Sequence, residues 1–298
     1  MTDLVIRPLV AGEEDLFDSM PDPLPQLRQI GYADGIAGGG YRPEHTWVAL
    51  RAGRVVGRAA WCLPPGAAGT PWLERFDLDA DPAVGAALLR AAHDALGGPL
   101  VYYAALPAHW RRRPEVLAVA TAPMAAARLA GLVERGERIR TSWTGTPLPA
   151  PSGRYTFRPA ADAAEINALV ARIATPDVLT GAEMALAVRG VDLARDPLAW
   201  LTGPAGDWLV ALDAGEPVGL AGTAGQACYP LLAYLGVLDE AVRGELLAEA
   251  VRVLSAGGAR EVVADVDAHR ARVLAELERT GFRQLRARVT FEPPAPRG

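Results

Sequence analysis

Lysine is absent from this sequence of 298 residues, so all thirty cationic side chains are arginine. A chain without lysine excludes Schiff-base catalysis, pyridoxal phosphate held on a lysine, and the P-loop lysine of nucleotide hydrolases. Arginine stays charged and cannot serve as a tunable base. The formal net charge of −5 gives no strong basic field that would favour nucleic acid or an anionic membrane.

Cysteine and histidine are also scarce. Cys62 and Cys228 are the only cysteines, and their wide separation excludes a CxxC zinc ribbon or redox motif. We expect each to behave as a small buried hydrophobe. His45 and His93 have no histidine or carboxylate partner at ligand spacing, so no metal site is expected.

Targeting and membrane signals are lacking as well. The opening MTDLVIRPL has neither a basic region nor the long apolar run of a signal peptide. The longest apolar stretch, residues 227–238, contains Pro230 and is too short to cross a bilayer. We therefore expect a cytoplasmic protein without a membrane partner.

An internal duplication organises what is present. Each half has a short extended run ending in Arg-Pro, then an acidic helix-forming stretch, then a hairpin with Ala-Gly at its turn. A strand, an acidic turn and a leucine-bearing helix follow. The paired segments are residues 5–8 and 156–159, 47–57 and 208–219, and 76–96 and 236–254.

The duplication predicts two domains of like topology. The segment TGTPLPAPSG at the midpoint is rich in Pro, Gly, Ser and Thr and is typical of a linker. We place the domains at residues 1–145 and 154–298, with a Pro-rich linker at 146–153. Each half should close with a helix, a glycine stop and a final strand of its own.

The order of elements resembles the GNAT superfamily of N-acyltransferases as a tandem pair, over nearly the whole chain. The resemblance implies an α/β (α+β) fold with a mixed, mostly antiparallel sheet flanked by helices in each domain. It also implies acetyl-CoA as co-substrate, a small-molecule amine as acceptor, and no metal. In such a fold two parallel strands splay, and an acyl-pantetheine arm pairs between them like a strand. A helix N-terminus then receives the diphosphate.

The second half has the better remnant of a donor turn. Its stretch RGELLA fits the family pattern at Arg243 and Ala248, although Leu246 replaces the usual glycine. The first half has Asp79 and Asp81 at this turn, which would repel phosphate. We expect the donor at Gly236, Val237, Leu238, Arg243, Gly244, Glu245 and Leu246.

Three residues are candidates for catalysis. Glu74 lies in an apolar strand, where a carboxylate is costly unless it is functional or paired, for example with Arg75. Tyr234 could hold a substrate or simply pack in the core. His269 could be an acid or base, or an exposed residue at a helix start. The tyrosine acid that the resemblance implies is replaced by Leu132 and Leu277.

One basic cluster, residues 109–113 with the sequence HWRRR, could bind a donor phosphate or RNA, or form a solvated loop. Three functions stay open: an acyl-CoA N-acyltransferase with one working half, a binding or scaffold protein that has lost the chemistry, and an acyltransferase with another donor. Such a donor would be an aminoacyl-tRNA or a carrier-protein thioester. The sequence leaves monomer and homodimer equally open.

Overall fold

The computed structural model describes residues 3–28, 30–67, 69–79, 81–201, 207–225 and 230–295. Cys228 falls outside these ranges, and so does part of the apolar stretch 227–238. The chain forms two compact units, one of Met1–Glu137 with Arg286–Gly298 and one of Arg138–Leu285.

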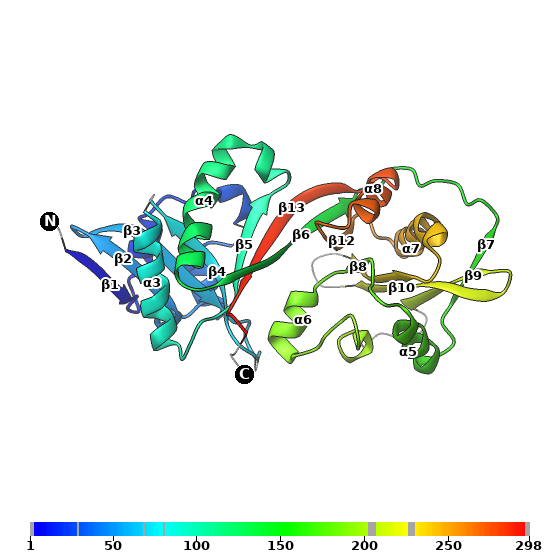
Figure 1. Cartoon of the computed structure of the whole chain (residues 1–298), viewed down its shortest axis with the longest axis horizontal. Helices are drawn as coiled ribbons and strands as arrows, with labels where there is room; N and C mark the ends of the chain where they lie inside the picture. The colour runs from blue at the N-terminus through cyan, green and yellow to red at the C-terminus, as the bar shows by residue number, and fades with distance from the viewer. Residues whose placement is uncertain are drawn as a thin grey trace. The chain divides into compact units, whose positions relative to one another are not determined.

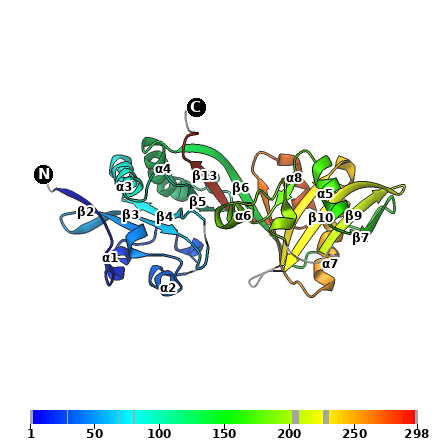
Figure 2. The ribbon, with the colours of Figure 1, turned by 90° about the horizontal axis from the view of Figure 1, so that it is seen from below.

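The first unit is a sheet with helices on both faces. Figure 2 shows α3 and α4 on one face and α1 and α2 on the other. The strand order is β1-β2-β3-β4-β5-β13. Its strands are β1 (Leu4–Pro8), β2 (Thr46–Arg51), β3 (Arg54–Cys62), β4 (Trp72–Leu78), β5 (Tyr102–Pro107) and β13 (Arg283–Glu292). Its helices are α1 (Glu14–Asp18), α2 (Tyr32–Ala37), α3 (Pro82–Ala95) and α4 (Pro114–Leu129), with short 3-10 turns η1 (Pro25–Leu27), η2 (Pro43–His45) and η3 (Trp110–Arg112).

The second unit repeats this plan with the order β7-β9-β10-β11-β12-β6. Figure 1 shows α7 and α8 on one face of its sheet and α5 and α6 on the other. Its strands are β6 (Val133–Trp143), β7 (Tyr155–Pro159), β8 (Val178–Leu179), β9 (Trp208–Asp213), β10 (Glu216–Gly225), β11 (Pro230–Val237) and β12 (Val262–Asp267). Its helices are α5 (Ala163–Arg172), α6 (Ala182–Arg189), α7 (Arg243–Ala256) and α8 (Ala271–Arg279), with 3-10 turns η4 (Pro197–Ala199) and η6 (Glu240–Val242).

The closing strands are exchanged between the halves. β13, the last strand of the chain, pairs antiparallel with β5 of the first unit, from Arg286↔Pro107 to Phe291↔Tyr102. β6, the closing strand of the first half, pairs with β12 of the second unit. The expected ranges 1–145 and 154–298 miss this exchange. Both halves end in the same kind of element, so the order of elements in the sequence does not show which sheet each closing strand joins.

The hairpins confirm the duplication in backbone detail. Ala52 and Gly53 between β2 and β3, and Ala214 and Gly215 between β9 and β10, all have positive φ. Two consecutive residues in the left-handed region favour the twist of a tight hairpin. The segment between β6 and β7 contains no helix or strand, in keeping with its composition.

Each unit also repeats one parallel strand pair and a β-bulge in the first strand of that pair. β4 and β5 share a single register pair, Leu73↔Tyr102, and β11 and β12 share only Leu231↔Val263. The register of β3 with β4 skips Glu74, and that of β10 with β11 skips Ala233. A bulge bends its strand and re-aims the extra side chain. The two parallel pairs therefore part in the same way in both halves.

Candidate active site

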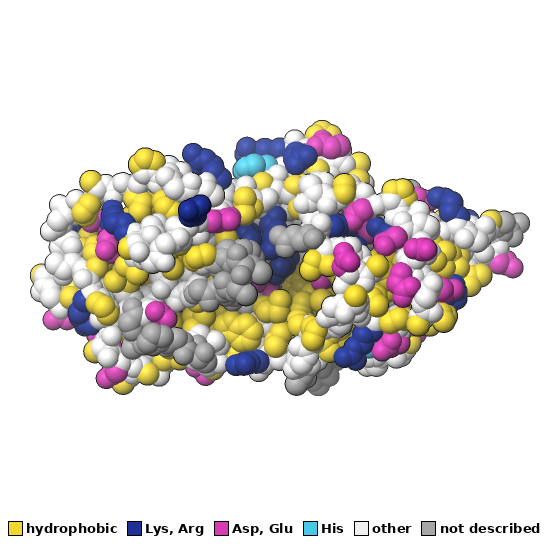
Figure 3. All heavy atoms as spheres, turned by 180° about the vertical axis from the view of Figure 1, so that it is seen from behind, with side chains coloured by type: hydrophobic (Ala, Val, Ile, Leu, Met, Phe, Trp, Pro, Cys, Tyr) yellow, Lys and Arg dark blue, Asp and Glu magenta, His cyan; other side chains and the backbone are white. Residues whose placement is uncertain are grey.

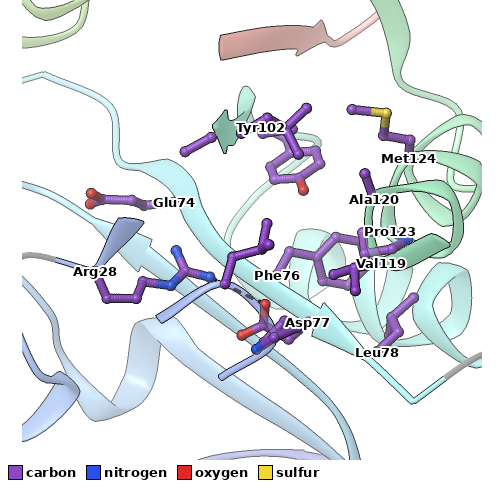
Figure 4. A pocket seen from close by; sticks show the side chains of 15 residues that line it. Arg28, Glu74, Phe76, Asp77, Leu78, Tyr102, Val119, Ala120, Pro123 and Met124 are labelled. Atoms are coloured by element: carbon purple, nitrogen blue, oxygen red, sulfur yellow. Dashed lines mark hydrogen bonds and ion pairs between the residues drawn. The ribbon is translucent and has the colours of Figure 1, made fainter. Parts of the chain in front are cut away.

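A pocket opens where β4 and β5 part in the first unit. It holds about 460 Å³ of space, part of it open to solvent. Figure 4 shows its walls, which come from four elements. The lining residues are Pro23, Leu24 and Arg28 around η1, Glu74, Phe76, Asp77 and Leu78 of β4, Tyr102, Ala104, Ala105 and Leu106 of β5, and Val119, Ala120, Pro123 and Met124 of α4.

This pocket passes through the sheet. α4 covers one face of the sheet and η1 belongs to the segment between α1 and α2 on the other, yet both line the same space. Such a pocket requires the strands to have separated. Asp79 N donates to Val56 O of β3 at 3.0 Å, so strand alternation points the N–H groups of Phe76 and Leu78 toward β5. These two groups are available to a ligand that lies between the strands.

Glu74 lies beside the single register pair, where the two strands begin to part. It is half-buried, and the Cys62 thiol is hydrogen-bonded to it. Burial first and the Glu74 charge second raise the pKa of Cys62, so the thiol keeps its proton. The alternative role for Glu74, an ion pair with an arginine such as Arg75, is not seen between these two residues. Arg75 instead donates to the Tyr41 hydroxyl at 3.2 Å and to the carbonyl of Ile30.

Two tyrosines near Glu74 stay protonated at neutral pH. Burial raises the pKa of Tyr41, and the Glu74 charge adds to the effect. Burial likewise raises the pKa of Tyr102, with Asp77 as the second cause. The Tyr102 ring stands edge-on to Phe76, with the ring centroids 5.6 Å apart. Tyr102 lines the pocket, so its protonated hydroxyl can donate to a ligand there.

The pocket floor contains a buried ionic cluster. Asp77 accepts from Arg58 Nε at 2.9 Å and from Arg28 Nη2 at 3.2 Å. Arg58 also donates to the carbonyls of Phe17 and Met20 at 2.8 Å each. Its charge is thus satisfied inside the protein, and it fastens the segment after β1 to the sheet.

The turn after β4 is acidic, as the sequence predicts. Asp81 caps α3 by accepting from Ala83 N at 2.9 Å, and Pro82 has no N–H to offer. Asp79 pairs with Arg54 at 2.5 Å and remains partly exposed. Gly85 does not serve a ligand. A Cβ there would lie 2.4 Å from Leu78 Cδ1 and 2.8 Å from Ala126 Cβ, so the glycine permits close packing.

The equivalent cleft of the second unit is filled by the chain itself. β8 pairs with β11 through Tyr234↔Leu179 and Leu235↔Val178. Thr180 N donates to Ala233 O at 2.9 Å, and the Thr180 hydroxyl accepts from Asp265 N of β12 at 3.0 Å. Residues 177–180 therefore bridge the two parted strands and occupy backbone groups that face the cleft.

Arg243, the remnant of the donor turn, is engaged internally. It is 8% exposed, and its Nε donates to Asp177 Oδ2 at 2.8 Å. Arg270 binds the other oxygen of the same carboxylate at 2.6 Å. A buried aspartate thus holds the arginines that follow β11 and β12. The expectation that Arg243 binds a donor phosphate stays a prediction, and it faces this obstacle.

The other residues of the expected donor turn also have structural partners. A Cβ at Gly236 would lie 2.7 Å from Ile173, and one at Gly244 would lie 2.2 Å from Glu276 Oε1. The Glu245 carboxylate accepts from Ser152 N at 3.0 Å. Leu246, which replaces the family glycine, is fully buried. Val237 ends β11 opposite Gly219, and Leu238 N donates to Val218 O.

The remaining catalytic candidates are not brought together. Tyr234 is fully buried against Trp208, with ring centroids 5.6 Å apart, and its hydroxyl has no partner among the described residues. Burial and then Asp177 raise its pKa. His269 is exposed in the turn between β12 and α8. Both belong to the second unit, whereas Glu74 belongs to the first.

The position of the missing tyrosine acid in the first half needs a correction. α4 ends before Gly131, which has φ +95°, just as α8 ends before Gly281, with φ +98°. Leu132 N bonds Ala127 O in the same way that Phe282 N bonds Leu277 O. The equivalent of Leu277 is therefore Ala127. Leu132, four residues before Gly136, is not the equivalent position, because Gly136 lies inside β6 and does not follow a helix. Both positions are apolar.

The sequence carries one signal that distinguishes the open cleft from the closed one. Residues 21–25 read PDPLP in the first half, and residues 176–180 read PDVLT in the second. Val178 and Thr180 of the closed cleft thus align with Pro23 and Pro25. Proline has no N–H and cannot donate to a neighbouring strand. The segment with two prolines lines the pocket, whereas its counterpart fills the cleft.

Among the described residues no three His, Cys, Asp or Glu side chains gather as metal ligands would. None of the helices described is both long and apolar enough to pass through a bilayer.

Comparison with solved structures identifies the fold. The chain is similar to a GCN5-related N-acetyltransferase from Sphaerobacter thermophilus, at 14% identity and a TM-score of 0.57, over 97% of this chain and 94% of that one. It is also similar to a functionally unknown conserved protein from Staphylococcus epidermidis, at 14% identity and a TM-score of 0.50, over 78% and 89%.

A tandem GNAT protein from the clavulanic acid biosynthesis pathway matches at 17% identity and a TM-score of 0.45, over 99% of this chain and all of that one. No protein-family model and no curated protein matches the sequence. The Sphaerobacter thermophilus structure, at a TM-score of 0.57, establishes the GNAT fold over the chain, and the strand orders of the two units show it in tandem.

Proposed function

We propose that the first unit transfers an acyl group from a thioester to the amino group of a small molecule, with Glu74 as the general base. The observation that carries this proposal is the pocket through the sheet with a half-buried carboxylate where β4 and β5 part. The second unit keeps the fold, but its cleft is filled by residues 177–180. The working half is thus the first, although the sequence favoured a donor in the second.

The chemistry follows from the geometry of the open cleft. A thioester arm pairs between β4 and β5, and the N–H groups of Phe76 or Leu78 polarise its carbonyl. Glu74 accepts a proton from the acceptor amine. The amine nitrogen then bonds the carbonyl carbon, the carbon–sulfur bond breaks, and the thiolate takes a proton from water. Holding both reactants in one cleft supplies further rate.

Acetyl-CoA is the first donor to test because the fold is shared with N-acetyltransferases. The cleft suits its thioester arm. The acidic turn before α3 does not suit its diphosphate. The same observation favours a second candidate function, a binding module that retains the cleft without catalysis.

Replacement of Glu74 separates these candidates. With an amine panel and acetyl-CoA, Glu74→Gln should lower turnover by about 10²–10⁴-fold, which is the usual contribution of a general base. Tyr234→Phe is the matched control, since that buried hydroxyl has no described partner, and it should retain turnover. Unchanged turnover in Glu74→Gln would refute the base. Thioester binding without turnover on any amine would favour the binding module.

A further inference from the structure

The wide end of the open cleft lies at the carboxyl ends of its two strands. β4 and β5 are paired at Leu73 and Tyr102 and part toward their carboxyl ends. With the thioester beside Glu74, the far end of the arm emerges between the turn before α3 and the turn that follows β5. These two turns differ in charge.

The turn before α3 offers little to a diphosphate. Pro82 has no N–H, and the N–H of Ala83 is already bonded to Asp81. A diphosphate here would meet the carboxylates of Asp79 and Asp81 at close range. The groups that usually bind the diphosphate of CoA in this fold are therefore missing from the first unit.

The opposite turn, residues 109–113, is basic, and we call it the basic turn. Trp110 anchors it, because the ring is buried and its Nε1 donates to Glu137 at 2.8 Å. Arg111 lies over that ring, 4.2 Å from its centroid, and also pairs with Glu137. Arg113 pairs with Glu115. Figure 3 shows basic side chains around a histidine over the connection between β5 and α4.

Arg112 is the side chain of this turn that stays available. It is exposed, and within the described residues it has neither an ion pair nor a side-chain hydrogen bond. The anchored Trp110 fixes the backbone on which Arg112 is carried. An anion at the wide end of the cleft could therefore be bound without breaking an internal pair.

In the second unit an arginine at the equivalent place already binds an anionic group. Arg270 follows β12 as the basic turn follows β5, and it binds the carboxylate of Asp177 at 2.6 Å. Asp177 is the first residue of the segment that fills that cleft. In this duplicated fold, an arginine after the second parallel strand thus holds the anionic end of a chain inserted between the strands.

We propose, resting on the function above, that the natural donor is an acyl group on the phosphopantetheine arm of an acidic carrier protein. The arm carries a single phosphodiester, which Arg112 binds, and acidic side chains of the carrier contact the basic turn. Free CoA would bring a diphosphate to the acidic turn before α3. An aminoacyl-tRNA would need a wider basic surface than three arginines on a chain of net charge −5.

The transfer itself is balanced. The acceptor amine forms a C–N bond with the acyl carbon, the C–S bond to the arm breaks, and the free thiol remains on the carrier. No oxidant, metal or further reactant is needed. The basic turn makes no contact with the reacting atoms, so it is a binding surface and not a catalytic one.

Binding experiments on the full chain test this inference without an acceptor. Fluorescence anisotropy would follow a purified acidic acyl carrier protein bearing acetyl-phosphopantetheine. Calorimetry would compare acetyl-CoA with acetyl-pantetheine, which lacks phosphate. Arg112→Glu should weaken carrier binding by about tenfold, with a loss of salt dependence. Arg195→Glu, an 88% exposed arginine of the second unit, is the matched control and should have no effect.

The outcomes separate this inference from the proposed function. It is overturned if Arg112→Glu binds the carrier like Arg195→Glu, or if acetyl-CoA binds more than about tenfold tighter than acetyl-pantetheine. Binding of uncharged tRNA in place of the carrier would also overturn it. If acetyl-CoA supports turnover that depends on Glu74, the proposed function survives that failure. If no thioester binds, both fall.

Discussion

Pro23 and Pro25 stand in the first unit where the second has Val178 and Thr180. The first segment lines an open pocket between β4 and β5. The second bridges β11 and β12 through the N–H and hydroxyl of Thr180. The same sheet, bulge and parallel pair therefore give a pocket in one unit and a filled core in the other. The two units differ in whether the short segment at the cleft has backbone N–H groups that can hydrogen-bond to the parted strands.

The two clefts also differ in how their aspartates are paired. Asp177 is 3% exposed and ties Arg243 and Arg270 to the filled cleft. Its counterpart Asp22 pairs with Arg28 in a more exposed setting, at 2.9 Å. A duplicated fold can thus turn a ligand site into a structural one, because an internal carboxylate and a short strand replace the ligand. Possession of the fold by itself does not show that both halves bind a donor.

The largest effect should come from removing the exchanged strand. Truncation after Leu285 deletes the part of β13 that pairs with β5, including the fully buried Val289 and Phe291. Each such side chain contributes about 1.5–3 kcal/mol, a large share of a domain's stability. We expect the first unit to unfold, with hydrogen exchange showing lost protection in β5 and retained protection in β12.

Truncation after Glu292 is the control for this exchange and should leave both units protected. Retained protection of β5 in the shorter chain would show that β13 does not complete the first sheet. Equal loss in both units would show that they fold as one body.

Removal of the Asp177 carboxylate should lower the free energy of unfolding by nearly as much. Asp177→Ala leaves the buried Arg243 and the partly buried Arg270 without their shared carboxylate, and removing one partner of a buried pair costs about 3–5 kcal/mol. Asp22→Ala, at the equivalent position, should cost about 1 kcal/mol or less because its ion pair is partly exposed. Urea unfolding measures both. Equal losses would contradict the assigned difference between the clefts.

Acid should weaken the first unit selectively. His93 in α3 is 4% exposed, and burial lowers its pKa from 6.5 to about 4. Its folded pKa lies below its unfolded one, so stability is full above pH 6.5 and falls as the pH drops toward 4. The loss is at most about 3 kcal/mol. Leu254 occupies the same position in α7, so the second unit should lack this dependence.

His93→Gln should flatten the fall in stability of the first unit between pH 6.5 and 4. Thermal unfolding across that range, with probes in α3 and α7, makes the measurement. An unchanged slope in the variant would assign the acid effect to other groups.

The smallest effect should come from a change in core packing, because different residues fill the equivalent space in the two units. In the first unit the Leu78 side chain fills the space above Gly85, whereas Leu246 stands at the position of Gly85 in the second. Gly85→Leu should therefore cost about 1–3 kcal/mol by overpacking. Adding Leu78→Val, the residue found at Val237, should recover part of it. Additive losses in the double variant, measured by urea unfolding, would rule out this compensation.

Much of the fold was predictable because it depends on local patterns. The Ala-Gly turns at residues 52–53 and 214–215 specify tight hairpins by their positive φ, and leucine spacing specifies α3 and α7. Glu74 was identified as a candidate because a carboxylate in an apolar strand is unusual. Cys62 was expected only to be buried, and its contact with Glu74 could not be predicted, because it joins two strands across a bulge.

The sequence by itself determined that the chain is a duplication, that no lysine chemistry operates, and that the turn before α3 is acidic. Only the tertiary structure decided which closing strand completes which sheet, and which cleft is open. Those choices depend on contacts between distant segments, such as Asp177 with Arg243 and Thr180 with Asp265. The two closing strands follow the same kind of helix and glycine, so the sequence does not show which sheet each one joins. Contacts made in the folded chain decide that pairing.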